Sequence, residues 1–133
     1  MTQPNVPVSW GELIDKITIL EIKVERLAAR NAVENAQREL TLLSAALAEL
    51  ADPPAALAVL RSSLAEVNRR LWGIEDAIRG KEAVQSFDAE FIALARGVYR
   101  NNDERSRIKR AINELLQSGI IEEKEYVSYR NAP

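Results

Sequence analysis

The side chains that could do chemistry in this chain are carboxylates, guanidinium and ammonium groups, hydroxyls and amides. The sequence contains no cysteine and no histidine. Disulfides and thiolate nucleophiles are therefore excluded, and so are the commonest metal ligand and general base at neutral pH. Any catalysis has to come from Asp, Glu, Lys, Arg, Tyr, Ser or Thr, and whether the chain is an enzyme stays open. We predict no metal and no cofactor.

A polar break interrupts an otherwise apolar pattern in the last third of the chain. Asn101 and Arg105 occupy positions at which the heptad spacing asks for apolar residues, and the pattern resumes in register at Ile108. A buried Arg needs a carboxylate partner, for which Glu21, Glu75 and Asp76 are the candidates. Two interpretations stay open here. The break is either a ligand pocket in the core or a structural feature, namely a polar layer that sets the register or simply the point at which the helix leaves the core.

A second cluster surrounds Trp72, which is followed by Gly73 and by the acids Glu75 and Asp76. Neighbouring acids can bind a divalent cation. However, Glu75 and Arg79 are spaced i,i+4 on a helix, and the simpler interpretation is a surface ion pair.

A basic run lies between residues 96 and 110 and contains Tyr99. Its cations are Arg96, Arg100, Arg105, Arg107, Lys109 and Arg110. Asp103 and Glu104 dilute this run, and the whole chain carries a net charge of −2. A solvated helix face is the better interpretation, and nucleic acid is not expected as a partner.

Long helices must position these residues. Hydrophobic residues make up 47% of the chain and charged residues 29%, which excludes a disordered protein. In the first helix, expected at about 10–30, apolar residues recur every three or four positions, and Ser9 with Glu12 forms the S-x-x-E capping box. A second helix should end before Asp52-Pro53-Pro54. Asp52 should then cap the third, which ends at Gly80 or at about Val84.

The fourth helix should begin at Ser86 or Asp88 and end at Gly119. Its apolar register favours one continuous helix through Asn101-Asn102-Asp103, with a break there as the alternative. We therefore predict one all-α domain over 1–133, with an N-terminal arm at 1–8 and a C-terminal tail at 121–133. Its expected architecture is an antiparallel bundle of about four long helices with coiled-coil-like heptad packing.

The first helix carries more apolar surface than one bundle interior needs. The extra residues are Trp10, Ile14, Ile19 and Ile22. A second apolar face needs a second partner, and a two-fold copy of the same chain is the simplest one. The sequence thus predicts a homodimer with these four residues at its interface.

Much of the chain resembles a group of small uncharacterised bacterial proteins classed as a domain of unknown function. The stretch that carries the resemblance best is Ser9-Trp10-Gly11-Glu12-Leu13-Ile14-Asp15-Lys16-Ile17-Thr18-Ile19-Leu20-Glu21-Ile22-Lys23, and further matches surround Leu71-Trp72, Ile74-Glu75-Asp76, Leu94-Ala95-Arg96, Asn102-Asp103 and Ile108-Lys109. The resemblance implies a bacterial origin and a helical fold, and it implies no activity, cofactor or ligand.

The matched motifs also mark polar residues that would share a surface if helices one, three and four meet. The candidate ligand-binding residues among them are Trp72, Glu75, Asp76, Arg79, Arg96, Tyr99, Asn102, Asp103 and Arg105. Residues 1–8 lack the pattern of a secretory signal, and no stretch is apolar enough to span a membrane, so a cytoplasmic location is expected. The expected function is a homodimeric interaction or scaffold module with a possible protein partner. The alternative is a small enzyme or ligand-binding protein with a polar pocket between helices one, three and four.

Overall fold

Four helices occupy most of residues 2–129, the part of the chain that the computed structural model describes. They are α1 (Trp10–Arg26), α2 (Arg30–Leu47), α3 (Ala55–Ala83) and α4 (Ala89–Leu115). No strand occurs within this range, so the all-α prediction is confirmed. Helix α4 runs unbroken through Asn101, as expected, whereas α1 stops short of residue 30. Residue 1 of the predicted arm and residues 130–133 of the predicted tail lie outside the described residues.

Two helices begin with a side-chain cap. Ser9 Oγ accepts a hydrogen bond from the backbone N–H of Glu12 at 3.1 Å, and Asp88 Oδ1 accepts one from that of Phe91 at 2.9 Å. Asp88, and not Ser86, is therefore the N-cap of α4. The bond from Phe91 and a further one from Lys81 lower the pKa of Asp88 to about 2.

Two expected helix starts are wrong in detail. The Glu12 carboxylate does not complete a capping box at Ser9, because Lys109 and Lys16 hold it instead. Asp52 does not cap α3, whose N-cap is Pro54. Asp52 has a φ of 45°, which is not the extended conformation that an N-cap residue adopts.

The ends of α3 and α4 share one turn geometry. The residue after each C-cap, Gln85 or Gln117, is left-handed, with φ of 53° and 52°. Around Gln117, the Ser118 N–H bonds to the Asn113 carbonyl at 2.8 Å, closing a Schellman motif. The motif therefore closes before Gly119, and the prediction that Gly119 ends α4 is wrong. Helix α3 passes Gly80 and ends at Ala83, close to the later of its two expected ends.

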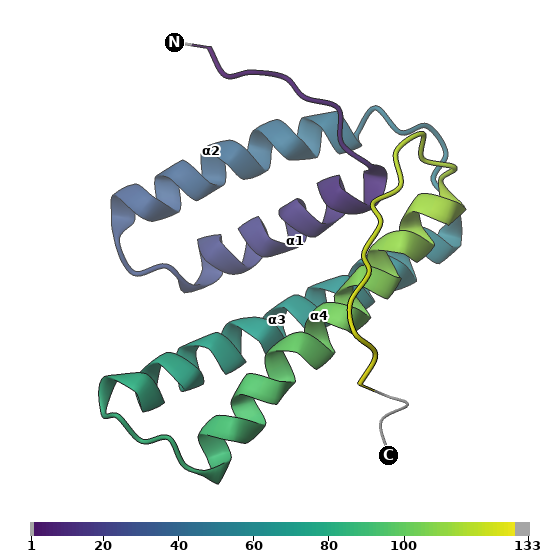
Figure 1. Ribbon diagram of the computed structural model, residues 1–133. Helices are drawn as coiled ribbons and strands as arrows, with labels where there is room; N and C mark the ends of the chain where they lie inside the picture. Colours follow the sequence, from purple (N-terminus) through teal and green to yellow (C-terminus); the bar gives the residue numbers. More distant parts are fainter. Residues whose placement is uncertain (1, 130–133) are drawn as a thin grey trace.

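The helices form two hairpins that meet at one end and diverge at the other (Figure 1). Helices α1 and α2 make one hairpin, and α3 and α4 make the other. Helix α1 packs against all three other helices, whereas α2 packs against α1 and not against α3 or α4. The chain is thus a bundle only where the hairpins meet, and no single interior runs along its length.

The hydrophobic core lies at this junction. Ile14 from α1, Leu57 and Leu64 from α3 and Ile112 from α4 are buried together. Partly buried side chains surround them, among them Trp10, Leu47, Leu60, Ile108 and Leu115. Burial of these side chains is the main force that joins the two hairpins.

Beyond the junction the α3–α4 hairpin is two helices thick, and the C-terminal tail lies along part of α4 (Figure 1). Between residues 69 and 111 no residue is buried, although apolar positions recur along both helices. The helices still pack closely, since a Cβ at Gly97 would lie 3.2 Å from Ile74 Cδ1. Among the residues described, no helix is long and apolar enough to cross a membrane.

The close approach of α1 to α4 yields a prediction at Gly11. A Cβ there would lie 2.5 Å from the Lys109 carbonyl oxygen, a backbone atom that cannot move aside cheaply. We expect Gly11→Ala to lower the free energy of unfolding by about 1–3 kcal/mol.

The matched control is Gly73→Ala in α3, where nothing lies within 4 Å of the added Cβ. This change should raise the free energy of unfolding by about 0.5–1 kcal/mol through helix propensity. Urea unfolding followed by circular dichroism measures both. Equal effects of the two substitutions would contradict the close approach.

Candidate functional site

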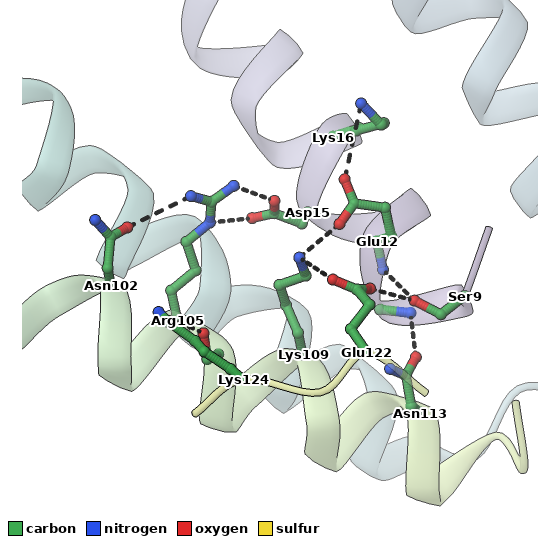
Figure 2. A network of polar contacts seen from close by, with 12 residues as sticks. Ser9, Glu12, Asp15, Lys16, Asn102, Arg105, Lys109, Asn113, Glu122 and Lys124 are labelled. Carbon is green, nitrogen blue, oxygen red and sulfur yellow. Dashed lines mark hydrogen bonds and ion pairs between the residues drawn. The ribbon is translucent and has the colours of Figure 1, made fainter. Parts of the chain in front are cut away.

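A buried carboxylate on α1 is the centre of the polar contacts between the hairpins. The Asp15 side chain is 1% exposed. Arg105 of α4 donates to it from Nε at 2.9 Å and also from Nη2, so the pair is bidentate. Asn68 Nδ2 of α3 adds a bond to Oδ1 at 2.9 Å. The charge of Asp15 is therefore balanced and hydrogen-bonded from two other helices (Figure 2 shows the Arg105 side).

Neighbouring groups hold the partners of Asp15 in place. Asn68 Nδ2 also donates to Thr18 Oγ1 at 2.9 Å, and Thr18 in turn donates to the backbone carbonyl of Asp15. Arg105 Nη1 donates to Asn102 Oδ1 at 3.5 Å. The bonds to Asp15 raise the pKa of Arg105 above its ordinary range, against the opposing effect of partial burial.

A second cluster ties the C-terminal tail to the start of α1 (Figure 2). Lys109 of α4 bonds to Glu12 at 2.5 Å and to Glu122 of the tail at 3.0 Å, and Ser9 donates to Glu122 at 2.7 Å. Burial lowers the pKa of Lys109, but the two carboxylates outweigh it, so the net shift is upward. For Glu122, burial raises the pKa, but the bonds from Ser9 and Lys109 make the net shift downward.

A cleft of about 460 Å³ opens beside Arg105, between α1, α3 and α4. Its lining residues are Ile19, Asn68, Leu71, Trp72, Glu75, Asp76, Arg79, Asn102 and Arg105. The residues from α3 recur every three or four positions and so share one helix face. Charges of both signs line the cleft, and Trp72 supplies its one aromatic wall.

The nine candidate ligand-binding residues divide between two places. The cleft brings together Trp72, Glu75, Asp76, Arg79, Asn102 and Arg105. The other three, Arg96, Tyr99 and Asp103, are not among its lining residues.

Arg96, Tyr99 and Asp103 belong instead to contacts of the tail and of α4. The Tyr99 ring packs edge-on against that of Tyr129, with 5.0 Å between centroids. Arg96 donates to the Tyr99 hydroxyl, and Asp103 lies 3.8 Å from Lys124. Among residues 2–129, no three acidic side chains gather where they could hold a metal ion.

A family model described as a family of unknown function (DUF6165) matches residues 4–133. The chain belongs to this family. No curated protein and no solved structure matches it.

The carboxylate partner of Arg105 in this DUF6165 protein was not among the expected ones. The break in the heptad does indicate an Arg that needs a carboxylate, but the partner is Asp15 and not Glu21, Glu75 or Asp76. Glu21 pairs with Arg61 and Glu75 with Arg79. Asp15 lies between Ile14 and Ile17 on the apolar side of α1, and a charge in that position is the signal that could have identified it.

The four residues expected at a dimer interface are largely used within the DUF6165 chain. Ile14 and Ile22 are buried by the chain's own helices. Trp10 packs against the core, and Ile19 lines the cleft. The second apolar face of α1 is therefore covered internally, since α2 packs on one side of α1 and α3 with α4 on another. These residues no longer argue for a second copy.

The Asp15–Arg105 pair yields a stability prediction. Asp15→Asn keeps the side-chain volume but leaves the Arg105 guanidinium without its counter-charge. We expect the free energy of unfolding to fall by about 2–3 kcal/mol, below the usual cost for a fully buried pair because Arg105 is 29% exposed.

Glu21→Gln, which removes an exposed partner of Arg61 at 3.0 Å, is the matched control and should change the free energy by less than about 0.5 kcal/mol. Thermal and urea unfolding compare the two variants. If Asp15→Asn were as mild as the control, Asp15 would not hold the hairpins together.

Tail docking should depend on pH through Glu122. Its pKa is lowered in the folded chain, so its stabilising effect is present above its ordinary value of 4.5 and is lost as the pH falls through the folded pKa. Backbone ¹⁵N relaxation should therefore report faster motion of residues 120–124 as the pH falls from neutral to about 3, with α2 unchanged. Glu122→Gln should show that motion already at neutral pH. A tail that stays rigid in acid would contradict this role.

Proposed function

We propose that this protein is a homodimeric interaction module of the bacterial cytoplasm, in which two copies pair through their α3–α4 hairpins. The observation that supports the proposal is the 69–111 stretch, which repeats apolar positions along two helices and contains no buried residue. A two-helix hairpin is half of a four-helix bundle, because each apolar seam needs a second layer. A second hairpin of the same kind supplies that layer by two-fold symmetry.

Exposed apolar side chains at the end of this hairpin support the same proposal. Val84 is 73% exposed, and Phe87 and Ile92 are each 56% exposed. Phe87 also packs edge-on against Phe91, with 5.2 Å between centroids, which holds its ring at the surface. Contiguous exposed apolar residues of this kind mark interaction surfaces on soluble proteins.

The total exposed area agrees with a missing partner. The chain exposes 9208 Å². A compact monomer of 14.9 kDa is expected to expose about 7,000 Å². The arm and the tail account for part of the excess of roughly 2,000 Å², and a standard interface buries only about 800 Å² per partner. The protein therefore has the surface that a stable dimer needs.

The experiment is light scattering after size exclusion over a range of protein concentrations. We expect a dimer for the native chain and a monomer for the double variant Phe87→Lys/Ile92→Lys, because two pairs of buried charges would face each other across the two-fold axis. Circular dichroism should show unchanged helix content.

Val59→Lys is the matched control. Val59 of α3 is 68% exposed but lies outside the 69–111 stretch, so this variant should remain a dimer. A native chain that stays monomeric throughout the concentration range contradicts the proposal. So does a dimer that persists in the double variant.

A further inference from the structure

The base of the cleft between α1, α3 and α4 holds a guanidinium in a fixed position. The Arg105 side chain is held on Asp15 through two of its nitrogens, and Asp15 is held in turn by Asn68. An Arg side chain that is already ordered loses little conformational entropy when it binds a ligand. Arg105 is therefore prepared for recognition of a further group.

Hydrogen-bond donors remain free at this base. A guanidinium has five N–H groups. The bonds to Asp15 and to Asn102 use three of them, so two remain on Arg105. The Asn102 Nδ2 amide makes no hydrogen bond to any described residue, and both residues line the cleft. N–H donors of this kind suit a carboxylate.

The α3 wall of the cleft offers the opposite charge. Asp76 is exposed and forms no hydrogen bond or ion pair with any described residue. Glu75 meets Arg79 only at 3.8 Å, a distance too long for a hydrogen bond. Glu75 and Asp76 are consecutive residues, and Trp72 lines the same cleft. Such a site suits an ammonium group, because carboxylates and aromatic faces both attract it.

The lining carries charges of both signs and is partly apolar. Arg79 and Arg105 are its cations and Glu75 and Asp76 its anions, and Arg105 is also paired with Asp15, which does not line the cleft. A ligand with a net charge would therefore meet repulsion as well as attraction, whereas a ligand with both charges can match both parts. Ile19, Leu71 and Trp72 supply apolar walls, and the volume of about 460 Å³ lies within the range of small-molecule sites.

We propose that this cleft binds a small zwitterion, namely an α-amino acid with an apolar side chain. Its carboxylate accepts hydrogen bonds from Arg105 and Asn102. Its ammonium group lies between Asp76 and Glu75, and its side chain packs against Trp72. The cleft shares part of the 69–111 stretch, but Val84, Phe87 and Ile92, the exposed apolar residues of the proposed dimer surface, do not line it, so either proposal can fail alone.

The test is a ¹H–¹⁵N NMR titration of the full chain with L-phenylalanine and L-leucine. The chain has two tryptophans, so the indole N–H of Trp72 reports on the cleft and that of Trp10 serves as an internal control. We expect saturable shifts of the Trp72 indole and the Asn102 side-chain amide, with Trp10 unchanged. N-acetyl-L-phenylalanine lacks the ammonium group, and L-phenylalaninamide lacks the carboxylate. Each should bind at least about fivefold more weakly than L-phenylalanine.

Two variants divide the site into its halves. Asp76→Asn should lower the affinity for L-phenylalanine about fivefold and should not lower that for N-acetyl-L-phenylalanine. Only L-phenylalanine has an ammonium group that Asp76 attracts. Asn102→Asp should weaken the binding of both L-phenylalanine and N-acetyl-L-phenylalanine but should not weaken that of L-phenylalaninamide, which has no carboxylate for the new charge to repel. Glu82→Gln, an exposed acid of α3 outside the cleft, is the control and should bind like the native chain.

Three outcomes would overturn the proposal. They are the absence of saturable shifts with both amino acids, equal affinity for L-phenylalanine and its two analogues, and shifts centred on Trp10. The Phe87→Lys/Ile92→Lys variant should bind as the native chain does, which separates this test from that of the dimer.

Discussion

The bidentate pair between Asp15 and Arg105 is the interaction on which the arrangement of the hairpins depends. It joins residues 90 positions apart and places a carboxylate with 1% exposure at the junction of α1 and α4. A charge buried so completely destabilises the fold by several kcal/mol unless it is paired and hydrogen-bonded. Asn68 and Thr18 complete its hydrogen bonds, so three helices are brought into one register around a single side chain.

The other contacts of the junction reinforce the same register. Asn113 Oδ1 accepts a hydrogen bond from the Gly11 N–H at 2.7 Å, which requires the backbone of α1 to lie directly on α4. Lys109 then reaches both Glu12 and the tail. The buried apolar cluster is small, and it would tolerate some sliding of α1 along α4. The polar contacts do not tolerate it, because a hydrogen bond weakens steeply once its donor and acceptor move out of line.

The local features of this fold could be predicted from the sequence, whereas the contacts between distant segments could not. Helix spacing, the Ser9 cap and the continuity of α4 follow from residues a few positions apart. The partner of Arg105 does not, because Glu21, Glu75 and Asp76 are equally suitable acids and only the packing of α1 selects Asp15. The divergence of the hairpins could not be predicted from the apolar pattern either, because the same heptad spacing is compatible with a packed pair of helices and with a four-helix bundle. The cleft residues were identified in part, because no motif near Asn68 marks it as one of them.

Unequal helix lengths connect the junction to both proposed surfaces. Helix α1 has 17 residues and α3 has 29, so α1 is about 26 Å long and α3 about 44 Å. Once Asp15 anchors α1 at the end where α4 finishes, α1 cannot cover the far part of the α3–α4 hairpin. The cleft lies where that cover ends, and the exposed apolar residues Val84, Phe87 and Ile92 lie beyond it. Exchange of the ion pair for apolar residues would often leave stability similar. The pair nevertheless fixes position, because a bidentate contact permits one orientation of α1, and that orientation leaves the cleft open.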